Sequence, residues 1–205
     1  MCNSPTSIVI HESVPAKTLL EFIAYARDNP TKLSYGTAGA GTLTHLAGEL
    51  FKQLIGVPGI THVPYKGAAP GVADLASGHI PMMTPNVGGP LLQFHATGKV
   101  RILSINAETR LAAAPEIPTA IEAGLPGMVA ANFNGLFAPA GVPRPVIDRL
   151  AHLTKAALAE KEVQDALIKS GFEPILDSGP EAGQQAVASE LTRWTPIVKA
   201  TNFKI

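Results

Sequence analysis

The residue types best suited to grip a small anion occur together in one glycine-rich stretch, SYGTAGAGTLTH. Glycines let the backbone approach a ligand closely, and amide groups at the start of a helix point toward negative charge. Each charge-assisted hydrogen bond of this kind contributes about 1.5–3 kcal/mol. The candidate carboxylate site comprises backbone amides and two hydroxyls, at Thr37, Ala38, Gly39, Gly41 and Thr42. A turn whose glycines serve only tight packing of a strand against a helix explains the pattern equally well.

Two better-known anion motifs do not fit this stretch. The phosphate-binding loop G-x-x-x-x-G-K-[ST] requires a lysine, and none follows Gly41. A dinucleotide site requires G-x-G-x-x-G and an acidic residue about 20 positions further on. His62 and Val63 stand at that place instead. The stretch therefore predicts neither a nucleotide phosphate site nor a dinucleotide site.

Two later segments also place small polar groups after predicted strands. In HVPYKGAAP, Lys66 offers a charge for a carboxylate, Tyr65 a ring that closes over a ligand, and Gly67 a helix start. A solvated loop lysine is the favoured interpretation of Lys66, and a half-buried packing residue is the alternative for Tyr65. In TPNVGGP, Asn86 is either a polar contact at the same sheet edge or the N-cap of the next helix.

No pattern in the sequence assembles a catalytic centre. His45 would need a nucleophile partner to act as a general base, so a packing histidine at a helix start is the favoured interpretation. The sequence has no G-x-S-x-G and no H-E-x-x-H. We therefore predict a binding protein with no catalytic residue, no metal and no cofactor. The alternatives are an α/β enzyme that uses the glycine-rich turn for an anionic substrate, and a nonfunctional fragment.

Composition limits the partners that such a protein takes. Lys and Arg number 16 and Asp and Glu number 16, so the formal net charge is zero and no basic cluster for nucleic acid is present. No segment approaches the roughly 20 apolar residues of a membrane span, and we expect no signal peptide in this chain. Cys2 is the single cysteine, which excludes an internal disulfide. We expect it to lie exposed in a frayed N-terminus.

Strand and helix patterns alternate through the first half of the chain. Strand patterns occur at 7–11, 33–36, 60–65, 79–84 and 100–105, with helix patterns at 18–29, 42–55, 69–77 and 86–97 between them. Glu21 stands three residues after Thr18, which predicts a capping box at the first helix. This alternation predicts an α/β fold with a parallel sheet covered on both faces.

The C-terminal third has a different pattern. Helix patterns begin at Pro143 and at residue 161, and a strand pattern covers 172–176. Ser178 and Glu181 predict a second capping box, which opens a final helix. Together with an extended segment after Val129, this part offers only two strands. Two strands make a poor sheet alone, so we expect this part to need a partner surface.

Five segments carry a resemblance that runs from about residue 8 to about residue 200. They are VPAKTLLEFIAYARDNP, LSYGTAGAGTLTHLAGELFKQLIG, THVPYKGAAPGVADLASG, PEIPTAIEAGLPG and FNGLFAPAGVPRPVIDRL. Together they resemble the Bug receptors (TctC type) of bacterial tripartite tricarboxylate transporters. The resemblance implies a periplasmic-binding-protein type II-like fold, whose two lobes close on a small carboxylate. It also implies a periplasmic location and delivery of the ligand to membrane transporter subunits or to a sensor.

The resemblance assigns parts of the chain to the two lobes. It implies a second lobe at 8–130 and a remnant of the first lobe at 131–205, with the front of the first lobe absent. The implied ligand-binding residues are Thr37, Ala38, Gly39, Gly41, Thr42, His45, Tyr65, Lys66, Gly67, Asn86 and Asn134. Pro85 stands where the family usually has an aspartate, so no partner for a ligand amine is implied there.

Overall fold

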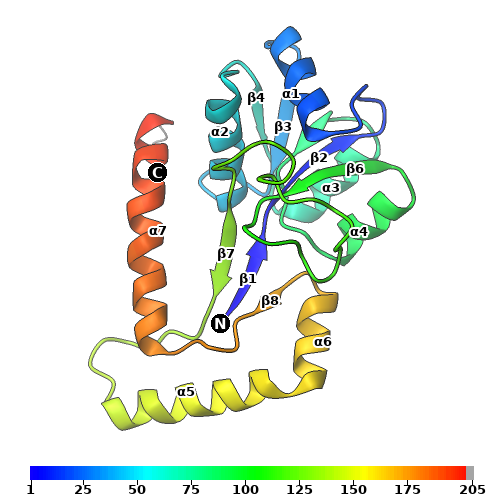
Figure 1. The fold of residues 1–205 in the computed structure, drawn as a ribbon. Helices are drawn as coiled ribbons and strands as arrows, with labels where there is room; N and C mark the ends of the chain where they lie inside the picture. Colours follow the sequence, from blue (N-terminus) through cyan, green and yellow to red (C-terminus); the bar gives the residue numbers. More distant parts are fainter. Residues whose placement is uncertain (202–205) are drawn as a thin grey trace.

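The computed structural model describes residues 1–201, which contain two β-sheets (Figure 1). The larger sheet has the strand order β4-β3-β5-β2-β6, and the smaller has β7-β1-β8. The strands of the larger sheet are β2 (Ser7–His11), β3 (Ser34–Thr37), β4 (Thr61–Pro64), β5 (Met82–Met83) and β6 (Val100–Ile105). Those of the smaller sheet are β1 (Cys2–Pro5), β7 (Ala131–Asn134) and β8 (Glu173–Pro174).

The larger sheet confirms the α/β prediction but differs from it in the direction of one strand. β3 pairs in parallel with both β4 and β5. β2 lies between β5 and β6 and runs antiparallel to both of them. Only Thr6 separates β2 from β1, so β2 enters from the smaller sheet and not through a helical crossover. The right-handed crossover that keeps sequential strands parallel therefore does not apply to it.

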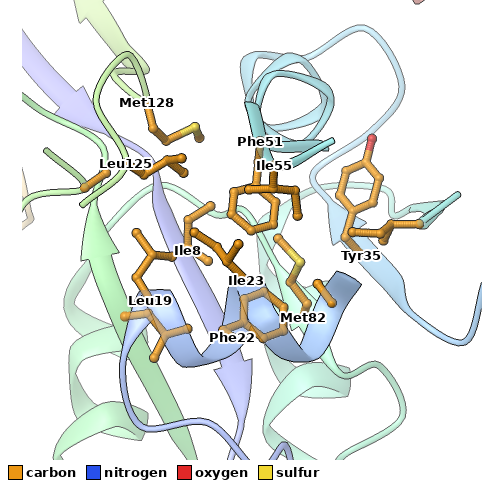
Figure 2. Packing of buried hydrophobic residues seen from close by; sticks show 14 of the residues in the cluster. Ile8, Leu19, Phe22, Ile23, Tyr35, Phe51, Ile55, Met82, Leu125 and Met128 are labelled. Atoms are coloured by element: carbon orange, nitrogen blue, oxygen red, sulfur yellow. The ribbon is translucent and has the colours of Figure 1, made fainter. Parts of the chain in front are cut away.

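Helices cover both faces of the larger sheet, and two hydrophobic clusters fill the layers between. The four helices are α1 (Leu19–Asp28), α2 (Leu43–Ile55), α3 (Ala68–Ala76) and α4 (Gly89–Ala96). Ile8 lies in the cluster with Phe22 and Phe51, whose ring centroids are 6.0 Å apart (Figure 2). Its neighbour Val9 lies in the other cluster, with Leu75. Successive residues of β2 thus point to opposite faces, and both faces are buried.

Only the first predicted capping box forms. At α1, Thr18 Oγ1 accepts from the Glu21 amide at 3.2 Å, and Glu21 Oε2 accepts from the Thr18 amide at 3.2 Å. The second is wrong, because α7 (Pro180–Ala200) follows Gly179 without a side-chain cap. Ser178 Oγ instead accepts from the Met1 amino group at 2.8 Å. Glu181 instead accepts from Arg144. Both alternatives involve a full positive charge, which outcompetes a neutral amide.

The N-terminus supplies the strand that the C-terminal part needed. β1 lies between β7 and β8, with Cys2 opposite both Asn134 and Pro174. The expectation of a frayed, exposed Cys2 is therefore wrong, and the side chain is half-buried. The segment CNSP has no apolar alternation, so only tertiary pairing makes it a strand. Residues 2–5 thus group with the C-terminal part of the chain.

The helices beyond β7 are poorly covered. α5 (Arg144–Ala159) and α6 (Lys161–Lys169) contain no buried residue. Val146, Leu150 and Leu153 follow one face of α5 and are 44–47% exposed. Figure 1 shows α5 and α6 extending away from the larger sheet. Among residues 1–201, no helix is both long and apolar enough to cross a lipid bilayer.

Candidate ligand-binding site

The turns after β3 and β4 lie side by side at one edge of the larger sheet. The Tyr65 amide donates to the Thr37 carbonyl at 3.0 Å, and the Gly67 amide donates to the Ala38 carbonyl at 2.9 Å. These strands are parallel neighbours, with Thr37 opposite Pro64, so both chains turn into helices at the same edge. These contacts bring together the first two of the three segments predicted from the sequence.

The end of β5 lies at the same edge, and we call this meeting point of the turns after β3, β4 and β5 the corner. Thr84, which is fully buried, makes the contact. Its amide donates to the Gly36 carbonyl at 3.3 Å. Its hydroxyl donates to the Thr44 carbonyl, in the first turn of α2, at 2.7 Å. Thr84 was not among the predicted residues, although its place at the end of a strand pattern was a usable signal.

Side chains of the glycine-rich turn accept hydrogen bonds from several of its own amides. The Ala38 amide donates to Thr44 Oγ1 at 3.0 Å, and the Gly41 amide donates to His45 Nδ1 at 3.2 Å. Thr42 is the N-cap of α2, and its hydroxyl donates to the Gly39 carbonyl at 2.7 Å. These contacts fix the shape of the turn before any ligand arrives. The first amides of α2 have no intrahelical acceptor and remain the natural donors to an anion.

The glycines of the turn serve different purposes. Gly41 has φ 78°, a left-handed conformation that side chains with a Cβ rarely adopt. A Cβ on Gly36 would instead approach Ile80 Cδ1 to 2.5 Å, so this glycine serves strand packing. The packing interpretation thus holds at Gly36, and anion binding by the turn stays a prediction.

Two stacked imidazoles lie behind the turn. The His45 and His62 ring centroids are 4.0 Å apart with an interplanar angle of 13°. His45 is only 6% exposed, in agreement with a packing histidine at a helix start. His62 Nε2 lies 2.7 Å from Thr37 Oγ1. Burial lowers the pKa of His45, and burial together with the charge of His45 lowers the pKa of His62 to about 4. Both rings are therefore neutral near pH 7.

A buried polar group that the sequence did not reveal lies beside these rings. Tyr35 Oη donates to Glu49 Oε1 at 2.6 Å, and Lys52 Nζ donates to the same oxygen at 2.8 Å. Burial and Glu49 raise the pKa of Tyr35. Burial pushes the pKa of Glu49 upward, but the hydrogen bonds from Lys52 and Tyr35 outweigh it and hold this pKa below its usual value. The spacing of Glu49 and Lys52 was the only signal in the sequence.

The second turn engages its side chains elsewhere. Tyr65 Oη donates to Asp74 Oδ2 on α3 at 2.7 Å, which holds the ring against α3. Burial and this hydrogen bond raise the pKa of Tyr65 to about 12. Lys66 is exposed beside it. In this state the tyrosine is a packing residue, and Lys66 is a solvated charge at the rim of the corner.

The two predicted asparagines do not meet. Asn86 Nδ2 donates to the Ser4 carbonyl at 2.7 Å, and Asn86 Oδ1 accepts from Asn132 Nδ2 at 3.3 Å. The N-cap interpretation of Asn86 is wrong, because α4 begins after Gly88. Asn134 is exposed and donates to the Cys2 carbonyl at 3.4 Å. Asn132 and Asn134 share one face of β7, so the sequence did not indicate which of them contacts Asn86.

A cavity of about 390 Å³ lies apart from this corner. It is formed by the smaller sheet, the loop after β6 and α7, and its lining includes Asn3, Phe133, Glu173, Glu190 and Arg193. None of the predicted site residues lines it. In residues 1–201, no group of three or more His, Cys, Asp or Glu side chains is arranged to hold a metal ion. The strand ends stay the candidate site predicted from the sequence, and the groups that they offer are backbone amides and hydroxyls.

The family model of the tripartite tricarboxylate transporter family receptor, TctC, matches residues 1–203. The chain belongs to this family. A UPF0065 protein from the tcbD-tcbE intergenic region of Pseudomonas sp. (strain P51) is 35% identical over 195 residues, covering 95% of this chain and 57% of that protein. BugT of Bordetella pertussis is 29% identical over 201 residues, covering 98% of this chain and 61% of BugT. The chain thus spans little more than half the length of these TctC-family relatives.

Solved structures of TctC-family proteins have the same fold. Rpa4515 of R. palustris with adipate superposes with a TM-score of 0.85 at 33% identity, over 97% of this chain and 66% of that one. MatC from Rhodopseudomonas palustris with bound malate gives 0.83 at 30% identity, over 96% and 67%. The periplasmic binding protein BugD gives 0.82 at 28% identity, over 97% and 66%. These matches confirm the predicted family and fold class, and the family is one of receptors, not enzymes.

Proposed function

We propose that the chain is the ligand-gripping part of an extracytoplasmic receptor that captures a small carboxylate. The observation that carries this proposal is the meeting of three strand ends at one corner, where α2 begins with a glycine-rich turn. Relatives with this fold hold adipate and malate, both small dicarboxylates. The bound receptor would present its ligand to tripartite transporter subunits in the membrane, or to a sensor, in the periplasm.

The chemistry of the corner suits a small carboxylate. The start of a helix favours a negative charge by roughly 0.3–2 kcal/mol, and a few charge-assisted hydrogen bonds add about 1.5–3 kcal/mol each. The amides of Leu43 and Thr44 supply such donors, and the exposed Lys66 supplies a charge at the rim.

The proposed residues fall into two groups by their contacts. Those that we propose shape or line the corner are Thr37, Ala38, Gly39, Gly41, Thr42, His45, Lys66 and Gly67. The side chains of Tyr65, Asn86 and Asn134 bond elsewhere in this state, to Asp74, to the Ser4 carbonyl and to the Cys2 carbonyl. A side-chain role for any of these three in binding would require that bond to break when ligand is present.

A thermal-shift measurement on the whole chain tests the proposal. Adipate and malate should raise the melting temperature in a concentration-dependent way, since a ligand that binds only the folded state stabilises it by mass action. Adipamide, which has the shape of adipate without its charges, should leave the melting temperature unchanged. Monodisperse protein that responds to no carboxylate would contradict carboxylate capture. Turnover of an anionic substrate would favour the enzyme alternative, and aggregation with a flat screen would favour the nonfunctional fragment.

A pair of glycine substitutions separates binding from stability. Gly41 (φ 78°) lies in the proposed site, whereas Gly98 (φ 77°) lies after α4, where an added Cβ would meet no atom within 4 Å. Alanine at either position is expected to lower the free energy of unfolding by about 1 kcal/mol or somewhat more, because both need a left-handed backbone. Only Gly41→Ala should remove the adipate-dependent shift. An unchanged shift in Gly41→Ala would place the ligand elsewhere.

A further inference from the structure

The hydrogen bond between His45 and Gly41 exists only while the imidazole ring is neutral. His45 Nδ1 accepts from the Gly41 amide at 3.2 Å. A neutral imidazole has one acceptor nitrogen, so the ring proton of His45 belongs on Nε2. A second proton would occupy Nδ1 and turn it into a donor that faces another donor. Protonation therefore breaks the contact that fixes the second half of the glycine-rich turn.

The surroundings link His62 to the same turn. The ring of His62 stacks on that of His45 at a centroid distance of 4.0 Å. His62 Nε2 lies 2.7 Å from Thr37 Oγ1, which also accepts from the Gly39 amide at 3.3 Å. A charge on one ring opposes a charge on the other at this distance. The pair therefore supports the turn at both halves as long as both rings are neutral.

Charged and titratable groups of α2 and β3 face the pair. Glu49 and Lys52 lie on α2, and Tyr35 on β3 has its ring centroid 5.0 Å from that of His62. Burial is the largest influence and keeps the His45 pKa low, Glu49 acts in the opposite direction, and Lys52 adds to burial. The neutral pair is thus the stable form near pH 7, and protonation follows on acidification.

We propose that neutral His45 is a positioning residue for the ligand-binding turn, so that carboxylate capture is lost when this ring takes up a proton. The loss of carboxylate binding rests on the proposed function, whereas the hydrogen bond between the Gly41 amide and His45 Nδ1 is present without ligand. A carboxylate receptor with this device releases its cargo as the medium becomes acidic.

Nuclear magnetic resonance on the ligand-free chain tests the contact directly. The Gly41 amide resonance should move with the same midpoint as the His45 ring nitrogens, and its hydrogen exchange should accelerate by at least tenfold relative to the intrinsic rate across that midpoint. A Gly41 amide that stays unchanged while His45 titrates would overturn the proposal. So would a His45 ring that is charged at pH 7. Neither outcome depends on whether any carboxylate binds.

Three variants then test the consequence with adipate as the probe. His45→Asn retains an acceptor, Oδ1, at the same number of bonds from the backbone as Nδ1, but cannot titrate. His45→Leu removes the acceptor. His95→Leu is the matched control, since His95 Nδ1 also accepts from a backbone amide, that of Ile102 at 3.3 Å, on the other face of the sheet.

Adipate affinity of the unchanged chain and of His95→Leu should fall by a larger factor between pH 7.5 and pH 5 than that of His45→Asn. His45→Asn should keep only the fall that protonation of adipate itself causes, and His45→Leu should bind weakly at both pH values. A His45→Asn variant with the pH dependence of the unchanged chain would refute the positioning role. If no variant binds adipate or malate at any pH, the proposed function fails, while the resonance experiment still decides the histidine contact.

Discussion

At the scale of single residues, the candidate site depends on side chains that serve the backbone. Thr44 and His45 accept from the Ala38 and Gly41 amides, and Thr42 begins α2. The sequence indicated the glycines and Thr42 because their types are diagnostic of turns and caps. It could not indicate from which amides these side chains accept hydrogen bonds, since that depends on how α2 packs on β3.

The buried histidines predict an acid-sensitive stability. The folded-state pKa of His62 is about 4, below its ordinary value of 6.5, and that of His45 is also lowered. The unfolded chain therefore binds more protons between these values, so their contribution is complete above about pH 6.5 and is lost as pH falls toward 4. We expect the free energy of unfolding, measured by urea denaturation, to fall through this window.

The slope of that pH dependence identifies its source. His62→Phe retains a ring for stacking and cannot titrate, so its free energy of unfolding should fall less steeply between pH 6.5 and pH 4. His152→Phe, at an exposed position of α5, should keep the slope of the unchanged chain. Glu49 contributes its own acid sensitivity in every variant. Equal slopes in all three proteins would contradict the assignment to the buried pair.

At the scale of elements, the starts of helices were the most predictable feature. Thr18 and Glu21 form the capping box that their spacing predicts, and α2 begins one residue after its predicted first position. These features depend on residues three or four positions apart. β1, the direction of β2 and the partners of Ser178 depend on residues more than 70 positions away, so local patterns could not reveal them.

The two predicted caps offer a direct comparison. Thr18→Ala removes an observed N-cap and should lower the free energy of unfolding by about 1 kcal/mol. Ser178→Ala removes no helix cap, but it removes the acceptor of the Met1 amino group, so its loss of free energy should come from the contact that holds the N-terminus. Chemical denaturation of both variants measures the two losses. A loss for Ser178→Ala that is unchanged when the Met1 amino group is acetylated would show that Ser178 supports α7 instead.

At the scale of the whole molecule, the two parts of the chain are covered very differently. The larger sheet is buried on both faces, whereas α5 and α6 bury no residue. The chain covers about two thirds of the solved TctC-family structures. These observations support our proposal that residues 8–130 form a second lobe and 131–205 part of a first lobe, joined by β1. In such a protein, further chain would cover the apolar face of α5.

The exposed stripe predicts self-association of this chain by itself. Leu150 and Leu153 are 44% and 47% exposed on one face of α5. Replacing both by glutamine should reduce self-association measured by sedimentation velocity, with a change in the free energy of unfolding of less than about 1 kcal/mol. Phe22→Ala, in the core, should cost about 3–5 kcal/mol. A large loss of stability in the double variant would show that α5 is packed in solution.

The proposed function depends most on where a carboxylate contacts the chain, and amide chemical-shift mapping with adipate measures that directly. We predict that the largest shifts fall on the amides of residues 38–45 and 65–67, the two turns joined by the Gly67–Ala38 hydrogen bond. Shifts centred instead on the cavity beside Arg193, with both turns unaffected, would contradict the proposed site.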